Sequence, residues 1–157
     1  MGLSKFLLDH MLGRMCRWLR IMGFDSKYVS SGYDDQQVIE ECRKLGAILI
    51  TRDRELASRY FPSILISSTD LNTQLRQFLS IYPFDRSLLL TRCTECNGVL
   101  EQKERGEIEN TLQYQTQKSY DIFYRCISCG RTYWNGPHYR NIIKRIEVIL
   151  GSDENPR

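Results

Sequence analysis

Residues 5–20 read Lys5-Phe6-Leu7-Leu8-Asp9-His10-Met11-Leu12-Gly13-Arg14-Met15-Cys16-Arg17-Trp18-Leu19-Arg20, and they predict a buried strand that runs directly into a helix. Residues 6–8 are apolar without alternation, which is typical of a strand covered on both faces of a parallel sheet. In a helical projection of residues 11–22, most apolar side chains and the arginines lie on opposite arcs. Asp9 stands between strand and helix, where free N–H groups favour anions. An ordinary strand–helix unit with a solvated arginine face also explains this stretch, so it assigns no function alone.

The order of strand and helix recurs three more times in the first half of the chain. We predict strands at residues 27–30, 47–51 and 63–67, and each is followed by a predicted helix, at 34–45, 53–60 and 70–79. Strands alternating with helices at this spacing predict a parallel sheet with right-handed crossovers and helices on both faces. The predicted fold class is therefore α/β.

An aspartate follows each predicted strand: Asp9, Asp34 or Asp35, Asp53, and Asp70. Because the carboxyl ends of parallel strands meet at one edge, where ligands bind in such sheets, these side chains should share that edge. Taken singly, each aspartate suits a helix N-cap better than a catalyst. Gathered together, however, like charges repel unless a cation lies between them. Carboxylates without histidine or cysteine among them suit Mg²⁺ or Mn²⁺.

Composition favours a globular protein of two parts. The 157 residues, 41% of them hydrophobic, have room for a domain of about 85 residues and a smaller module. There is no apolar run long enough to span a membrane and no signal peptide, so we expect a cytoplasmic protein without a membrane partner. A net charge of +3 permits nucleic-acid binding without arguing for it. The break at residues 82–86 predicts a boundary between Ile81 and Thr91, with domains at 1–82 and 91–150.

Four of the six cysteines form two Cys-x-x-Cys pairs separated by 29 residues. In a chain without an export signal, this spacing indicates a metal site before disulfides. Four thiolates close a tetrahedral zinc site, which leaves no open position, so the zinc is structural. The predicted ligands are Cys93, Cys96, Cys126 and Cys129. Cys16 and Cys42 lie on apolar helix faces and are expected to be buried small side chains.

The rest of the second half is less regular. We expect a loop, or a short helix plus a hairpin, at residues 101–119, a strand at 131–134, and an amphipathic helix at 137–150. His138 stands at the start of this helix, where it suits a surface or capping residue better than a metal or phosphate ligand.

Taken together, these motifs resemble the Mut-seven C-terminal ribonuclease domain family, a PIN-like domain followed by a zinc ribbon. The resemblance runs from Lys5 to about Tyr139 and is carried by residues 6–9, 11–15, 17–20, 23–25, 34–35 and 48–53, both cysteine pairs, and 133–136 with His138. It implies a metal-dependent ribonuclease. By matching position, it implies metal-site carboxylates at Asp9, at Asp35 or its neighbour Asp34, and at Asp53.

Our hypothesis for the reaction uses these carboxylates with nearby arginines. Asp9 and Asp53 would be the main Mg²⁺ or Mn²⁺ ligands, and Asp35 would hold metal-bound water or a second ion. Arg14 and Arg52 would bind phosphate bidentately. Single-stranded RNA would be bound by stacking and by charge, with contacts expected from Arg17, Arg131, Tyr133, Trp134, His138 and Arg140. The sequence leaves open a second function, that of a non-catalytic RNA-binding or ribosome-associated module whose aspartates hold no metal.

Overall fold

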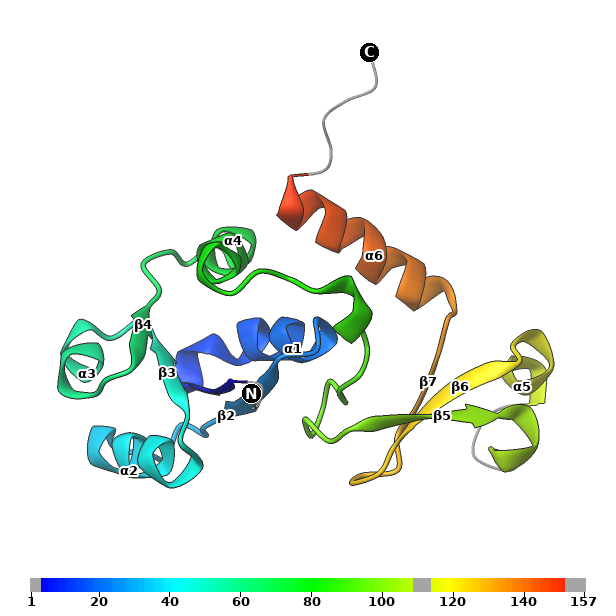
Figure 1. Cartoon of the computed structure of the whole chain (residues 1–157), viewed down its shortest axis with the longest axis horizontal. Coiled ribbons are helices and arrows are strands. Elements are labelled where there is room, and N and C mark those ends of the chain that lie inside the picture. The colour runs from blue at the N-terminus through cyan, green and yellow to red at the C-terminus, as the bar shows by residue number, and fades with distance from the viewer. Residues whose placement is uncertain (1–3, 109–113, 152–157) are drawn as a thin grey trace, which may run out of the picture. The chain divides into compact units, whose positions relative to one another are not determined.

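The computed structural model describes residues 4–108 and 114–151, which belong to two compact units, Met1–Asn97 and Gly98–Arg157 (Figure 1). The first unit holds a parallel four-stranded sheet of order β2-β1-β3-β4. Its strands are β1 (Lys5–Leu8), β2 (Asp25–Tyr28), β3 (Ile48–Thr51) and β4 (Ser63–Leu65). The predicted α/β class and parallel sheet are confirmed, and β1 lies in the interior of the sheet. Whether residues 1–82 and 91–150 fold as separate domains stays a prediction.

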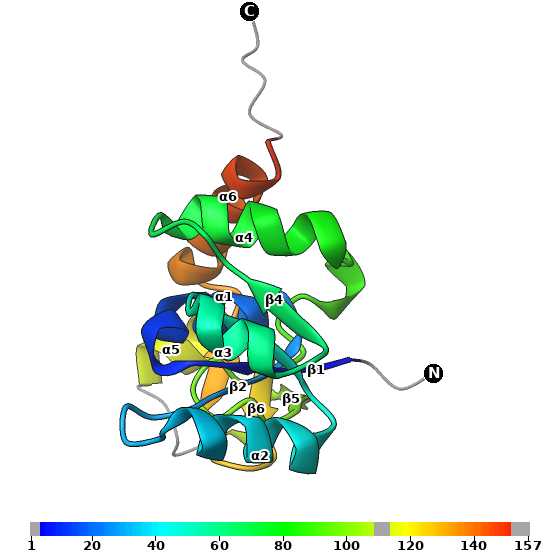
Figure 2. The same cartoon turned by 90° about the vertical axis from the view of Figure 1, so that its left-hand side faces the viewer.

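Helices cover both faces of this sheet, α1 and α4 on one and α2 and α3 on the other (Figures 1 and 2). As predicted, each of the four strands is followed in the chain by a helix. The helices are α1 (Gly13–Ile21), α2 (Asp35–Leu45), α3 (Arg54–Arg59) and α4 (Leu71–Ile81), with the 3₁₀ turns η1 (His10–Leu12) and η2 (Arg86–Leu88). Among the described helices, none is both long enough and apolar enough to cross a bilayer.

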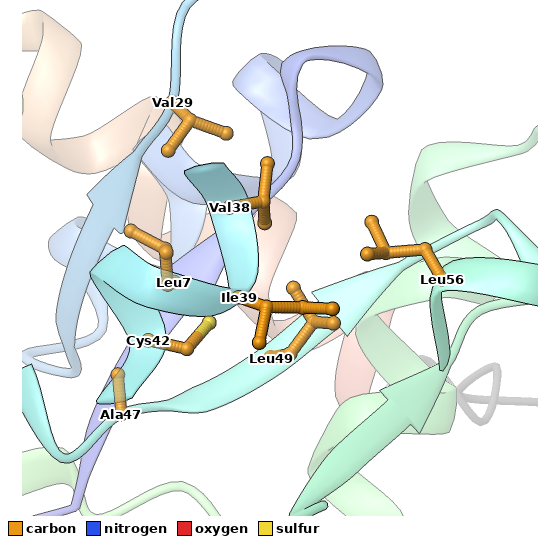
Figure 3. Packing of buried hydrophobic residues seen from close by; sticks show 8 residues of the cluster. All are labelled: Leu7, Val29, Val38, Ile39, Cys42, Ala47, Leu49 and Leu56. Carbon is orange, nitrogen blue, oxygen red and sulfur yellow. The ribbon is translucent and has the colours of Figure 1, made fainter. Parts of the chain in front are cut away.

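The two faces of β1 carry separate cores, because consecutive side chains of a strand point to opposite faces. Leu7 and its partner in register, Leu49, meet side chains from α2 and α3 (Figure 3), namely Val38, Ile39, Cys42 and Leu56. On the other face, Phe6 meets the rings of Phe78 and Tyr82, with centroid distances of 5.1 and 5.0 Å. Burial on both faces explains why residues 6–8 are uniformly apolar.

The second unit contains an antiparallel three-stranded sheet of order β5-β6-β7. Its strands are β5 (Leu100–Glu104), β6 (Ile122–Cys126) and β7 (Thr132–Trp134), and its helices are η3 (Arg105–Glu107), α5 (Tyr114–Ser119) and α6 (Pro137–Leu150). The predicted final helix has the predicted bounds. Pro137 stands in its first turn, and Gly151 ends it in the left-handed conformation, at φ 74°.

Several predicted bounds were wrong. Strand β2 covers residues 25–28 instead of 27–30, because Lys5 to Leu8 pair with Asp25 to Tyr28. Helix α4 continues to Ile81. Of the two alternatives for residues 101–119, a short helix plus a hairpin is found in part: α5 spans Tyr114–Ser119 and β5 pairs antiparallel with β6, but β6 lies beyond this stretch, at Ile122–Cys126. Residues 109–113 of that stretch lie outside the described residues. The sequence of β5, Leu-Glu-Gln-Lys-Glu, has no apolar alternation, since this edge strand forms by pairing with β6 more than by burial.

Candidate functional site

Asp9 occupies the carboxyl end of the interior strand β1, and it is the one buried carboxylate among the four predicted metal ligands, with 5% of its surface exposed. Its Oδ1 accepts from the Met11 N–H at 2.9 Å. Its Oδ2 accepts from the Thr51 hydroxyl and from the Arg52 backbone N–H at 3.3 Å. All three donors are neutral, and no lysine or arginine of the described residues forms an ion pair with Asp9. A buried negative charge held by neutral donors favours a cation nearby.

Thr51 links Asp9 to the start of α3. Its hydroxyl donates to Asp9 and accepts from the backbone N–H of Asp53 at 2.9 Å. Asp53 caps α3, because its Oδ1 accepts from the N–H groups of Glu55 and Leu56 at 2.8 and 3.0 Å. The carboxyl ends of β1 and β3 are thus joined through one buried threonine side chain.

Asp34 and Asp35 stand at the start of α2 and have structural partners. Asp34 and Gln37 form a capping box, with bonds of 2.8 Å from Gln37 N–H to Asp34 Oδ1 and 2.9 Å from Asp34 N–H to Gln37 Oε1. This confirms the capping role that the sequence indicates. Asp35 forms a half-exposed ion pair with Arg59, at 2.9 Å. Asp70 likewise caps α4 and accepts from the backbone N–H and the hydroxyl of Thr73.

The four cysteines of the two Cys-x-x-Cys pairs come together. Within residues 4–108 and 114–151, theirs is the one group of three or more metal-binding side chains found close enough to share an ion. The sulfurs of Cys93, Cys96, Cys126 and Cys129 all lie within 4.8 Å of one another, and none is in a disulfide. Zn–S bonds of about 2.3 Å in a tetrahedron place the sulfurs about 3.8 Å apart. The donor set and spacing therefore fit zinc, whereas the aspartates share an edge without converging in this way.

The backbone around the second pair is shaped for close approach to sulfur. A Cβ on Gly98 would lie 2.7 Å from Cys126 Sγ and 2.7 Å from Ser128 Oγ, so no other residue fits there without movement. Gly130 adopts φ 76°, which favours glycine. The N–H of Cys129 donates to Cys126 Sγ at 3.5 Å. Gly98 thus leaves room for the second cysteine pair, and Gly130 provides the left-handed conformation that follows it.

The arginine face of α1 is only partly solvated, contrary to the plain strand–helix interpretation. Arg14 is exposed. Arg17 pairs with Glu95 at 3.3 Å on the surface. Arg20 is half-buried and donates to the carbonyls of Ser26, Thr94 and Glu95, at 2.8, 3.1 and 2.7 Å. Arginines 17 and 20 therefore hold the segment that carries the first cysteine pair.

Arg52 follows β3 and lies beside Asp9 through its backbone. Its side chain is half-buried, and its Nε is buried without a hydrogen-bond partner in the described part of the chain. An unsatisfied donor at this edge fits an anionic ligand, although it does not identify one.

Tyr133 and Trp134 do not form one stacking surface, because consecutive residues of β7 point to opposite faces. Tyr133 lies opposite Tyr124 of β6, and Trp134 lies opposite Phe123. Sequence analysis predicted no strand at residues 122–126, so it did not foresee the pairing of Tyr133 with Tyr124. The remaining predicted RNA contacts of this unit are exposed, namely Arg131, His138 and Arg140.

Cys16 and Cys42 are buried, as their positions on apolar helix faces predict. Burial raises the pKa of the Cys16 thiol to about 11 and that of the Cys42 thiol to about 12. Both therefore stay protonated at neutral pH and are inert as nucleophiles.

These features define an α/β protein with aspartates at the carboxyl edge of its parallel sheet and a cluster of four cysteines. A family model described as the Mut7-C RNAse domain matches residues 4–146, nearly the whole chain, and the chain belongs to this family. The resemblance noted in the sequence is thereby confirmed, and the family's description points to a ribonuclease-like role with RNA as substrate. A search of curated proteins and a search of solved structures each returned no match.

Proposed function

We propose that this chain is a metal-dependent ribonuclease that hydrolyses RNA phosphodiester bonds at the carboxyl edge of the parallel sheet. The observation that carries the proposal is Asp9, a buried carboxylate at the end of β1 whose hydrogen-bond donors are all neutral. A divalent cation bound there would balance its charge. Membership of a ribonuclease family supports the same conclusion.

The residues at this edge would have different roles in the reaction. Asp9 and Asp53 would hold Mg²⁺ or Mn²⁺, and Asp34 or Asp35 would hold metal-bound water or a second ion. When bound, such a cation lowers the pKa of water and stabilises charge on the phosphate. Thr51 fixes the Asp9 carboxylate through its hydroxyl. Arg52, with its unsatisfied Nε, and Arg14, which is exposed, would bind the phosphate oxygens.

Zinc would have a different role in the same chain. Four thiolates fill all positions of a tetrahedral ion, so zinc at the cysteine cluster would be structural. The ribbon that it holds would aid RNA binding. Its contacts to single-stranded RNA would come from Arg131, Tyr133, Trp134, His138 and Arg140, together with Arg17 of the first unit.

The test compares Asp9→Asn with Asp85→Asn in a cleavage assay on single-stranded RNA with added Mn²⁺. Asp85 is the control, because it caps the 3₁₀ turn η2 as Asp9 caps η1, accepting from the Ser87 N–H at 2.9 Å, but it is exposed and follows a helix instead of a strand. A lost metal ligand costs several kcal/mol of transition-state stabilisation, so Asp9→Asn should cleave at least about 100-fold more slowly. Equal cleavage by the two variants and the wild type would refute the assigned site.

The alternative is a non-catalytic RNA-binding or ribosome-associated module. It is favoured by the structural role that each carboxylate already has, as a cap at Asp9, Asp34 and Asp53 and as an ion pair at Asp35. Under this alternative, RNA binding persists unchanged when Mg²⁺ and Mn²⁺ are withheld, and no RNA of a broad panel is cleaved by the zinc-loaded protein with Mn²⁺. Metal-dependent cleavage that is lost in Asp9→Asn would exclude it.

A further inference from the structure

Tyr28 is an exposed aromatic residue at the edge of the sheet where the proposed reaction takes place. It is the last residue of β2 and pairs in register with Leu8, the residue before Asp9. The next backbone bond, from Val29 N–H to the Leu8 carbonyl at 3.0 Å, holds the two strand ends together. Although it stands at this position, 45% of the Tyr28 surface is exposed.

The Tyr28 ring is held in place by the turn that follows Asp9. Its hydroxyl donates to the His10 carbonyl at 3.3 Å. Its edge lies against Gly13, where an added Cβ would be 3.3 Å from ring atom Cε2. Gly13 has a helical backbone, with φ −58°, so its conformation does not require glycine. The close approach of the ring accounts for glycine at this position better than the backbone does.

A ring that is fixed before binding loses little conformational entropy when a ligand stacks on it. Arg14 is exposed and follows Gly13, the residue that the ring contacts, directly in the sequence, so a cation is available at the start of α1. An aromatic face next to a cation is the combination that binds single-stranded RNA, through base stacking and phosphate contact.

We propose that Tyr28 stacks on a base of single-stranded RNA and that Arg14 binds the adjoining phosphate, which places that nucleotide beside Asp9. This inference rests on the proposed ribonuclease function, since it names the substrate contact of the same site. It adds a binding residue in the first unit to those expected in the ribbon.

The test measures binding of a short fluorescein-labelled oligoadenylate by fluorescence anisotropy. The zinc-loaded full chain carries Asp9→Asn throughout, so that the probe stays intact. Stacking of one base is worth about 1–3 kcal/mol, so Tyr28→Leu should raise Kd about 10-fold. Tyr28→Phe, which keeps the ring, should stay within about twofold. Phe61→Leu is the matched control, because Phe61 is 91% exposed in the loop before β4, at the opposite edge of the sheet. Its Kd should not change.

A second variant tests the ring without removing it. Gly13→Ala favours the helix but pushes the Tyr28 ring aside by a few tenths of an ångström. It should weaken binding about threefold while the protein stays as stable as its parent. This variant decides the matter if Tyr28→Leu does not fold.

The inference is refuted if folded Tyr28→Leu binds as tightly as its parent, or if Tyr28→Phe weakens binding as much as Tyr28→Leu does. It is also refuted if an oligonucleotide without bases shows the same loss in Tyr28→Leu, because stacking needs a base. Failure here is distinct from failure of the proposed function. The latter is judged by cleavage in Asp9→Asn, with Tyr28 intact.

Discussion

Asn97 is expected to be one of the polar residues of the first unit whose substitution lowers the free energy of unfolding most. It follows Cys96 and fastens this segment to the edge strand β2. Its Oδ1 accepts from the backbone N–H of Ser26 at 3.1 Å, and its Nδ2 donates to Asp25 Oδ1 at 2.7 Å. Asn97 is 8% exposed and Ser26 is fully buried. The amide therefore satisfies an edge-strand group that water does not reach.

The expected loss in Asn97→Ala has three parts. A buried N–H at Ser26 left without a partner costs about 1–3 kcal/mol, and the lost bond to the Asp25 carboxylate costs about 1.5 kcal/mol more. Asn97 has φ 66°, and alanine in this left-handed region costs about 1 kcal/mol. Since such contributions are not strictly additive, we expect a decrease of about 3 kcal/mol in the free energy of unfolding. Asn97→Gly avoids the backbone cost and should lose about 2 kcal/mol.

The assay is denaturant unfolding of the zinc-loaded chain, followed by its helical circular dichroism. Asn141→Ala is the control, because Asn141 is exposed within α6, and the substitution should change the free energy of unfolding by less than about 0.5 kcal/mol. If Asn97→Ala has the same free energy of unfolding as this control, the contacts of Asn97 contribute nothing to stability and the reasoning fails. If Asn97→Gly is as stable as wild type, the loss belongs to the backbone alone.

Three further predictions use other parts of the chain. Gly23→Ala should lower the melting temperature by well over 5 °C, since Gly23 has φ 88° and an added Cβ would lie 2.2 Å from the Leu88 carbonyl; an unchanged melting temperature would contradict this. The free energy of unfolding should fall as pH rises above 9, by up to about 1.4 kcal/mol per pH unit for each buried thiol. The reason is that the thiols of Cys16 and Cys42 have a pKa of 9.0 in the unfolded chain and of about 11 and about 12 in the folded one, so only the unfolded chain loses these protons just above pH 9. The double variant with alanine at both positions should show a smaller slope, and an equal slope would refute the assignment. Finally, Cys126→Ser should lower zinc per chain in elemental analysis yet keep most of the helical signal, because helices α1 to α4 belong to the first unit; undiminished zinc would exclude Cys126 as a ligand.

The fold of the first unit could be predicted because its signals are local. The uniform apolar run at residues 6–8, the capping box of Asp34 and Gln37, and the helix end at Gly46 each depend on neighbours within a few positions. The two cysteine pairs are also a local signal, since two cysteines at this spacing lie on one tight turn. The polar strand β5 gave no such signal, because its stability comes from a partner strand.

The docking of the first cysteine pair on α1 and β2 could not be predicted in this way. Arg20 looks like a solvated arginine in a helical projection, but its partners Thr94 and Glu95 lie more than 70 positions along the chain. Asn97 looks like an ordinary loop residue, and its role depends on the unpaired edge of β2. Periodicity reports which face of an element is apolar, and it does not report which polar groups a distant segment will satisfy.

The aspartates show a different limit, because the same atoms serve both interpretations. A carboxylate at a strand end caps the next helix and also faces the edge where ligands bind, so the sequence gives one pattern for two roles. Exposed Asp34 and Asp53 are explained by capping alone, since bonds to backbone N–H groups suffice for a solvated carboxylate. Asp9 also caps a helical turn, η1, but it differs from these two in being buried. Its hydrogen-bond donors are the Met11 N–H, the Thr51 hydroxyl and the Arg52 N–H, and none of them carries a positive charge. A cation at this edge would supply the missing positive charge, which is why the functional test is best placed at Asp9 and not at the other carboxylates.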